Sequence, residues 1–314
     1  MGDGGGAIGA QVLLRRPRPF PWVYAYAPRG PVAARWDAAS IEAFSQLIRS
    51  RPAGLAGRIS HLRIDPEIER DGPDDRDGAL RAALVAAGWR PAPTVQVNSS
   101  RVVDLAPDEE QLWSDLRATW RQNVRRGRRD GLQVTEGGAD DLATFYAIHL
   151  ETARRVGFAT RSEAVFRAIW ERYSANDSAR LLFARTPDGE PVATLFLLRC
   201  GSRVVEPWAG MTRRGAESRA NYLLKWEAIT SSRASGATSY DMWGGLTFPG
   251  IAEFKRGFGG REIEYIGAWD LVLDPLGWLA YAPGRRAALR LRRALPGGSG
   301  RGTGGSSQAA GGDD

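Results

Sequence analysis

The first hundred residues alternate between two hydrophobic patterns. Short apolar segments with period-two character, bounded by Pro, Gly or charged residues, predict strands. Between them apolar residues recur at helical spacing, as Ile41, Phe44, Leu47 and Ile48 do, and predict helices. The strands are expected at 21–28, 58–65 and 95–105, and the helices at 38–51 and 79–87. This order indicates a mixed sheet with helices on its faces.

A second unit begins near residue 107 with a long helical pattern. Asp108 is a plausible N-cap, acidic residues fill the first turn, and Gly131 ends the helix. Further strands are expected at 132–138, 180–186, 191–200, 203–209, 238–243 and 263–273, and further helices at 140–156, 162–173 and 221–234. The chain is therefore predicted to be an α+β protein with two domains, each a mixed sheet flanked by helices.

The two ends of the chain differ in composition from the rest. Residues 1–17 are glycine-rich, then basic and proline-rich, and are expected to be disordered; 283–314 read as a basic helix followed by a flexible tail. Between them we expect a first domain of 18–106 completed by 263–282, and a second domain of 107–262. The arginines of 285–293 are either a solvated face or a contact to anionic lipid or RNA.

No secretory signal and no membrane-spanning segment are visible in the sequence. The N-terminal stretch lacks the apolar core of a signal peptide, and no apolar run approaches the roughly 18 residues that a spanning helix needs. We therefore expect a cytoplasmic protein, placed at the inner face of the membrane if the basic helix binds lipid.

Composition excludes several kinds of catalytic site. A single cysteine, Cys200, excludes a disulfide framework and cysteine-based metal centres, and two histidines, His61 and His149, leave little for a metal cluster or a histidine triad. Phosphate-loop, dinucleotide and serine-hydrolase motifs are absent, as is the turn that grips acyl-CoA pyrophosphate in acetyltransferases. We expect neither a metal nor a cofactor.

The basic residues are unusual in kind. The net charge is +7, and of 43 Lys and Arg residues only Lys225 and Lys255 are lysines. A GC-rich coding bias accounts for the excess of arginine. A lysine that persists against such a bias is a candidate for chemistry that needs a compact ammonium with a tunable pKa. Lys255 follows Phe254 in a segment rich in glycine and aromatic residues, 240–260, which indicates a ligand site; the alternative is a tight corner with a solvated lysine.

The helix predicted over 108–131 carries a line of cations. Its neighbouring four-residue stripes are apolar (Leu112, Leu116, Trp120, Val124) and basic (Arg117, Arg121, Arg125, Arg129). Acidic partners at i, i+4 are nearly absent, so binding of RNA phosphates is as credible as a solvated face. A third possibility is that Arg121 caps or pairs within its own domain.

Residue strings along the whole chain resemble the FemABX aminoacyltransferases. In the first half these strings are YAPRGP (26–31), LRIDPE (62–67) and RVVDL (101–105), with Gly88-Trp89 and Val95-Gln96. In the second half they are RQNVRRGRRDGLQV (121–134), ETARRVGFATR (151–161), LFARTPDGEPVATLFLL (182–198), YDMWGGL (240–246) and GIAEFKRGFGG (250–260). The likeness is collinear over about residues 22–280. It implies two acetyltransferase-like domains, an aminoacyl-tRNA as donor and a peptidoglycan precursor, UDP-linked or lipid-linked, as acceptor.

The resemblance also implies site residues. Phe254 and Lys255 match the family's FK-x-x-F-G motif, and Arg161 falls where the family places an arginine on the precursor's phosphates. An ester is already activated, so the main demand on the enzyme is to stabilise an oxyanion, worth about 3–4 kcal/mol per well-placed donor. Lys255 is expected to donate in a pocket with Trp243. Asp241 and Trp208 complete the expected substrate site, and Trp208 stands where relatives often carry tyrosine.

Two departures from the family pattern leave other functions open. Relatives usually have some tens of residues before the YAPRGP strand, so the first domain is expected to lack a strand and a helix, or the start to be misplaced. There is no room for the long helical hairpin of some members, which implies the short, monomeric type. The alternatives are an inactive acyltransferase fold that binds nucleic acid or an anionic surface, and an acyl-CoA-dependent N-acyltransferase.

Overall fold

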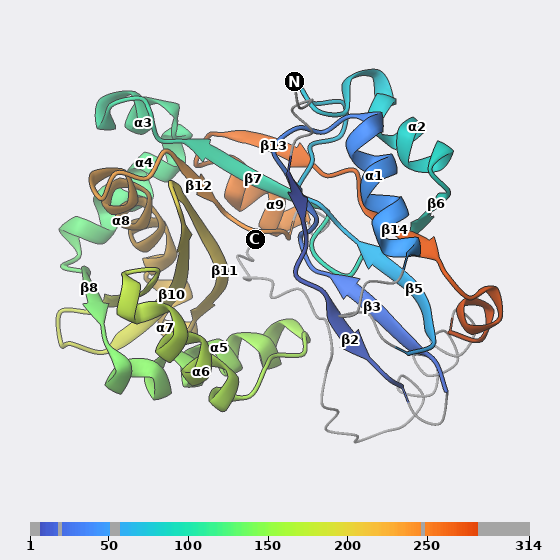
Figure 1. Cartoon of the computed structure of the whole chain (residues 1–314). Coiled ribbons are helices and arrows are strands. Elements are labelled where there is room, and N and C mark those ends of the chain that lie inside the picture. Colours follow the sequence, from blue (N-terminus) through green and yellow to red (C-terminus); the bar gives the residue numbers. More distant parts are fainter. Residues whose placement is uncertain (1–6, 18–20, 51–56, 246–248, 282–314) are drawn as a thin grey trace. The chain divides into compact units, whose positions relative to one another are not determined.

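The computed structural model of the chain describes residues 7–17, 21–50, 57–245 and 249–281 (Figure 1). These residues form two compact units: unit 2 is Ser99–Ile263, and unit 1 comprises the described residues before and after it. The basic helix and tail expected at 283–314 lie outside the described residues, as do residues 246–248.

Unit 1 is built on a five-stranded sheet with the order β2-β3-β5-β14-β6. Its strands are β2 (Leu13–Arg15), β3 (Val23–Ala27), β5 (Ile59–Ile64), β6 (Trp89–Ala92) and β14 (Ala268–Val272). The helices are α1 (Ala38–Arg49) and α2 (Ala79–Ala86), with a 3-10 turn at Arg76–Gly78. Three residues of the predicted apolar face of α1 are confirmed, because Ile41, Phe44 and Ile48 are buried in one core with Leu62 and Trp89. The prediction is wrong for Leu47, which is 50% exposed.

Part of the N-terminal segment is ordered, contrary to the expectation of disorder over 1–17. Residues Ile8–Gly9 form β1, which pairs with β4 (Val32–Ala33), and β2 pairs antiparallel with β3. Strand pairing satisfies the backbone donors and acceptors of this segment. Its glycine-rich and basic composition gave no reason to expect that it would join a sheet.

Unit 2 contains a seven-stranded sheet with the order β13-β7-β12-β11-β10-β9-β8. Its strands are β7 (Ser99–Asp104), β8 (Gln133–Gly137), β9 (Ala179–Arg185), β10 (Pro191–Cys200), β11 (Arg203–Met211), β12 (Ser239–Asp241) and β13 (Arg261–Glu264). Its helices are α3 (Glu109–Asp115), α4 (Ala118–Arg129), α5 (Leu142–Val156), α6 (Glu163–Tyr173), α7 (Arg213–Glu217), α8 (Ala220–Ala234) and α9 (Pro249–Arg256), with 3-10 turns at Ala139–Asp141 and Ser174–Asn176.

The two faces of the unit 2 sheet bury two separate clusters. On β9, Leu182 and Ala184 belong to the cluster formed with α4 and α8, whereas Leu181 and Phe183 belong to the cluster formed with α5 and α6. Successive side chains of a strand point to opposite faces. Helices therefore cover both faces of this sheet (Figure 1), and the predicted fold class, mixed sheets flanked by helices, is confirmed.

The helix predicted over 108–131 is two helices. Asp108 is the N-cap as expected and accepts from the Gln111 amide at 2.8 Å. The helix stops because Leu116 and Arg117 take extended backbone, with ψ of 139° and 142°. The Arg117 amide then donates to the Gly257 carbonyl at 2.9 Å, so the break connects this segment to the end of α9.

The strand predicted over 263–273 is likewise two strands. β13 lies in the seven-stranded sheet of unit 2, and β14 lies between β5 and β6 in the sheet of unit 1. Gly267, with φ of 83°, precedes β14 and allows the change of direction between the two strands. Hydrophobic period alone could not show this change of sheet.

Within the described part of the chain, no helix combines the length and hydropathy needed to cross a bilayer.

Candidate active site

Two parallel strands part at the centre of the unit 2 sheet. β11 pairs with β12 from Arg203↔Ser239 to Val205↔Asp241, where β12 ends. β11 continues to Met211 without this neighbour. A pocket with an empty volume of about 410 Å³, part of it open to solvent, lies where the strands separate. Its walls come from β10, β11, α8 and α9: Ala193, Thr194, Leu195, Glu206, Ala209, Gly210, Met211, Asn221, Leu224, Lys225, Phe254 and Lys255.

The chain that leaves β12 turns through consecutive left-handed residues. Trp243, Gly244 and Gly245 have φ of 50°, 57° and 78°. A Cβ on Gly245 would lie 2.8 Å from Cγ2 of Ile251, so this position requires glycine for space as well as for conformation. The turn directs the carbonyl oxygens of residues 242, 243 and 244 to one point.

The ammonium of Lys255 occupies that point. Nζ donates to the carbonyl oxygens of Met242 at 2.7 Å, Trp243 at 2.9 Å and Gly244 at 2.7 Å. A protonated lysine has three N–H donors, so this arrangement uses all of them. Lys255 is 2% exposed. In this conformation it holds the turn closed, and donation to an oxyanion would require it to release one carbonyl.

Burial, together with the nearby charge of Lys225, lowers the pKa of Lys255 to about 7. The carboxylates of Glu206 and Asp241 act in the opposite direction. The site therefore holds an amine whose charge changes near neutral pH.

Asp241 fixes the start of the turn. It is fully buried, accepts from the hydroxyl of Ser100 and from Arg203, and accepts from the backbone amide of Trp243 at 2.7 Å. These contacts occupy both carboxylate oxygens. Asp241 is thus placed to shape the backbone that Lys255 binds.

A second buried charge pair lies in the same pocket. Glu206 accepts from Nζ of Lys225 on one oxygen and from the Tyr240 hydroxyl at 2.5 Å on the other. Burial and the Glu206 charge raise the pKa of Tyr240 well above its ordinary value, so the hydroxyl remains a donor. The sequence singled out Lys225 only through the rarity of lysine, and its pairing with Glu206 depends on the β11–α8 packing.

Phe254 forms an aromatic wall beside these charges. Its ring packs against Tyr222 and Phe258, each at a centroid distance of 5.2 Å, and lies 5.9 Å from Nζ of Lys225. The Trp120 indole donates to the Phe254 carbonyl at 3.0 Å. The FK pair of α9 is therefore held by α4 and α8, and the structure brings Phe254, Lys255, Trp243 and Asp241 together.

The four arginines of the basic stripe differ in their surroundings. Arg117 pairs with Glu253 of α9, and the guanidinium of Arg125 lies 5.3 Å from the Trp113 ring centroid. Arg121 donates to the carbonyls of Ser114 at 2.7 Å and of Leu116, at the end of α3. Arg129 pairs with Asp130 at 3.0 Å. The surroundings of Arg121 favour the capping alternative for that residue.

The other two expected substrate residues, like Trp243 and Asp241, are not among the residues that line the pocket. Arg161 is exposed in the loop between α5 and α6. Trp208 of β11 packs edge-on against Phe166 at 5.2 Å and against Phe196 at 5.5 Å. Trp208 therefore adds to the core beneath α5 and α6.

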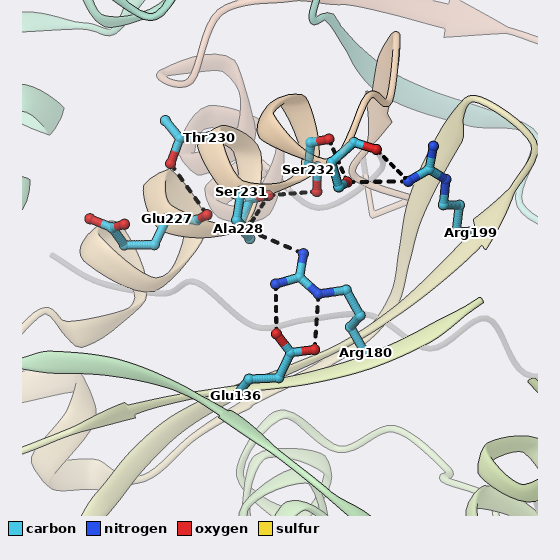
Figure 2. A network of polar contacts seen from close by, with 9 residues as sticks. Glu136, Arg180, Arg199, Glu227, Ala228, Thr230, Ser231 and Ser232 are labelled. Carbon is cyan, nitrogen blue, oxygen red and sulfur yellow. Dashed lines mark hydrogen bonds and ion pairs between the residues drawn. The ribbon is translucent and has the colours of Figure 1, made fainter. Parts of the chain in front are cut away.

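A polar network anchors the helix that carries Lys225. Figure 2 shows Arg180 of β9 between Glu136 of β8 and Ser231 of α8. The guanidinium makes two bonds to the carboxylate, at 3.0 and 2.9 Å, and one to the Ser231 hydroxyl at 3.3 Å. Arg199 donates to the Ser235 carbonyl at 2.8 Å. These bonds fix α8 against the sheet at the end remote from the pocket.

Comparison with known proteins finds a matching family model and similar aminoacyltransferases. A family model described as an acetyltransferase (GNAT) domain matches residues 114–256. The UDP-N-acetylmuramoylpentapeptide-lysine N(6)-alanyltransferase of Weissella viridescens is 28% identical over 286 residues, covering 87% of this chain and 83% of that protein. The lipid II:glycine glycyltransferase of Staphylococcus haemolyticus (strain JCSC1435) is 20% identical over 338 residues, covering 84% and 80%.

Solved structures show the same fold. A crystal structure of FemX matches with a TM-score of 0.76 at 19% identity, covering 89% of this chain and 88% of that one. The fold and its parted strands define an acyltransferase of the GNAT-like class. The similarity to these relatives supports the resemblance to the FemABX aminoacyltransferases seen in the sequence.

Proposed function

We propose that this protein moves an amino acid from an aminoacyl-tRNA to an amine on the stem peptide of a peptidoglycan precursor. The observation that carries the proposal is the pocket between the parted strands, where the FK pair, Phe254 and Lys255, lies beside a second buried lysine, Lys225. The named activities of the two relatives, on a muramoylpentapeptide lysine and on lipid II, support the acceptor.

The reaction needs little beyond positioning and charge stabilisation. The acceptor's amine nitrogen attacks the ester carbonyl carbon of the charged tRNA, so that a C–N bond forms and the ester C–O bond breaks. The proton lost by the amine ends on the released ribose hydroxyl. The carbonyl oxygen carries negative charge in between, and a buried ammonium stabilises it strongly.

The remaining site residues are assigned to the two partners. Arg161 is exposed and suits bidentate binding of the precursor's diphosphate. Arg117, Arg125 and Arg129 are exposed along α4 and suit the tRNA backbone. We propose that the protein acts as a monomer.

The test is incubation of the purified protein with a pool of charged tRNAs and with UDP-linked or lipid-linked muropeptide. We expect the muropeptide mass to increase by one amino acid residue. Uncharged tRNA and a muropeptide with an acetylated stem amine are the matched controls and should give no product. Absence of product with every charged tRNA and both acceptors would overturn the proposal, and transfer from acetyl-CoA instead would identify an acyl-CoA enzyme.

A further inference from the structure

The pocket contains a second buried ammonium, to which the proposed function assigns no role. Lys225 lies on α8 and is 3% exposed. It lines the same pocket as Lys255, and these two are the only lysines in the sequence. Arginine occupies every other basic position, so the pocket is the place where this chain retains the smaller cation.

Counting hydrogen-bond donors distinguishes the two lysines. Lys255 directs its three donors to three backbone carbonyls. For Lys225, Glu206 is the one hydrogen-bond acceptor of Nζ among the residues that the structure describes. A protonated amine has three N–H groups. Lys225 therefore retains donors that the pocket can use, whereas Lys255 does not.

The surroundings of Lys225 hold its ammonium in place. The second oxygen of Glu206 accepts from the Tyr240 hydroxyl, which helps to hold the carboxylate beside Lys225. The Phe254 ring, 5.9 Å from Nζ, attracts the cation through its π face. A donor fixed in this way before the reaction costs no reorganisation when charge develops.

We propose that Lys225 is a catalytic residue that donates a hydrogen bond to the oxyanion of the donor ester, with Glu206 and Tyr240 as its positioning residues. The inference rests on the proposed function and specifies its chemistry. As the amine attacks, the π electrons of the carbonyl move to oxygen and meet the Lys225 N–H. When the carbonyl re-forms, the ester C–O bond breaks and the hydrogen bond weakens. Lys255 keeps the turn at residues 242–244 closed.

A direct test uses the fact that the chain has only two lysines. Protein labelled with ¹³Cε- and ¹⁵Nζ-lysine should give two sets of side-chain signals, which a Lys225→Arg variant assigns. The probe is adenosine esterified at its 3′ oxygen with 1-aminoethylphosphonate, a tetrahedral anionic mimic of the reacting ester. We expect the Lys225 signals to shift on titration while those of Lys255 stay in place. A shift of Lys255 alone, or of neither lysine, would overturn the inference.

Kinetics separate a catalytic role from a purely structural one. Lys225→Met should lower kcat by about 100-fold or more while leaving KM nearly unchanged, as for loss of an oxyanion donor. This variant leaves Glu206 without its cation, so the matched control is the double variant Lys225→Met with Glu206→Gln, which removes both charges. An oxyanion donor predicts that the double variant stays slow. Recovery of wild-type kcat in the double variant would show that Lys225 only neutralises Glu206 and would overturn the inference. Thermal denaturation of both variants reports whether they fold.

The two proposals fail in different ways. If wild-type protein makes no product from charged tRNA while the phosphonate still shifts the Lys225 signals, the proposed acceptor is wrong and the oxyanion site stands. If wild-type protein is active and the phosphonate shifts only Lys255, the function stands and the assignment to Lys225 is wrong.

Discussion

Lys225 and Lys255 are both buried and line the same pocket, and the charge of the first lowers the pKa of the second. Two like charges in a low-dielectric site repel each other strongly. The pocket compensates through the Glu206 carboxylate on one side and three carbonyl dipoles on the other. The arrangement concentrates positive charge where we propose that the acyl-transfer oxyanion forms.

Substitution of Lys255 by methionine should nearly abolish transfer and also lower stability. Methionine fills a similar volume but leaves the carbonyls of Met242, Trp243 and Gly244 without their donor. An unsatisfied buried group costs about 1–3 kcal/mol. Single-turnover transfer and urea denaturation measure the two effects. Lys255→Arg should rescue poorly, because a guanidinium is larger and aims its donors differently; transfer at the wild-type rate by Lys255→Met would refute any catalytic need for this lysine.

The stability of the protein should depend on pH through Lys255. Burial lowers the pKa of this amine from 10.5 to about 7. Above pH 7 the folded chain therefore loses the proton that the unfolded chain keeps up to about pH 10.5. Unfolding takes up a proton in this window, so the free energy of unfolding rises with pH by up to about 1.4 kcal/mol per unit. Below pH 7 both states are protonated and the dependence ends.

The measurement for this prediction is urea denaturation of wild type and Lys255→Met between pH 6 and 9. The unfolding free energy of wild type minus that of Lys255→Met should increase with pH above pH 7 and stay constant below pH 7. A difference independent of pH over this range would show that the Lys255 amine titrates near its ordinary value.

Substitution of Gly245 by alanine should disturb the turn that Lys255 binds. The residue has φ of 78°, and a Cβ would lie 2.8 Å from Ile251. The left-handed conformation alone costs about 1–2 kcal/mol for a residue with a side chain. Gly236→Ala is the matched control, since Gly236 has φ of 81° with open space around its missing Cβ. Both variants should lose stability, but only Gly245→Ala should lose transfer activity. Equal transfer rates in the two variants would show that catalysis does not depend on the geometry of this turn.

Arg121 and Arg125 should respond differently to substitution by glutamine, which keeps helix propensity. Arg121 bonds the last carbonyls of α3, so Arg121→Gln should lower the unfolding free energy by about 1–3 kcal/mol and leave tRNA binding unchanged. Arg125 is exposed, so Arg125→Gln should weaken binding of all tRNAs alike. The slope of log K against log salt should flatten by about 0.7 for one lost phosphate contact. An unchanged slope for Arg125→Gln would remove this face of α4 from the tRNA site.

Hydrophobic periodicity predicted most of the strands and helices, because the residues that make one face of an element apolar and the other polar lie close together in the sequence. The apolar stripe of α1 and the N-cap at Asp108 follow from nearest neighbours along the chain. The break at Arg117 does not, because it depends on a bond to the Gly257 carbonyl. β6 was missed, since Trp89–Ala92 contains a proline and a charged residue in a short segment.

Part of the candidate site was predicted because its residues lie close together in the sequence. Phe254, Lys255, Trp243 and Asp241 are close in sequence, and a family motif marks them. The Glu206–Lys225 pair joins a strand to a helix, and no local pattern connects these residues. The two lysines meet only because β11 and β12 part where α8 and α9 supply the walls.

The position of β14 has a consequence for synthesis on the ribosome. This strand lies between β5 and β6, although the whole of Ser99–Ile263 separates it from them in the chain. While the chain emerges, β5 and β6 have no central partner, and their backbone edges remain open to wrong pairing. Unit 2, which is continuous in sequence, can complete its fold first. Most of unit 1 is thus translated first, but its sheet is the last that can be completed. Chaperones that shield open strand edges would therefore act on the N-terminal half.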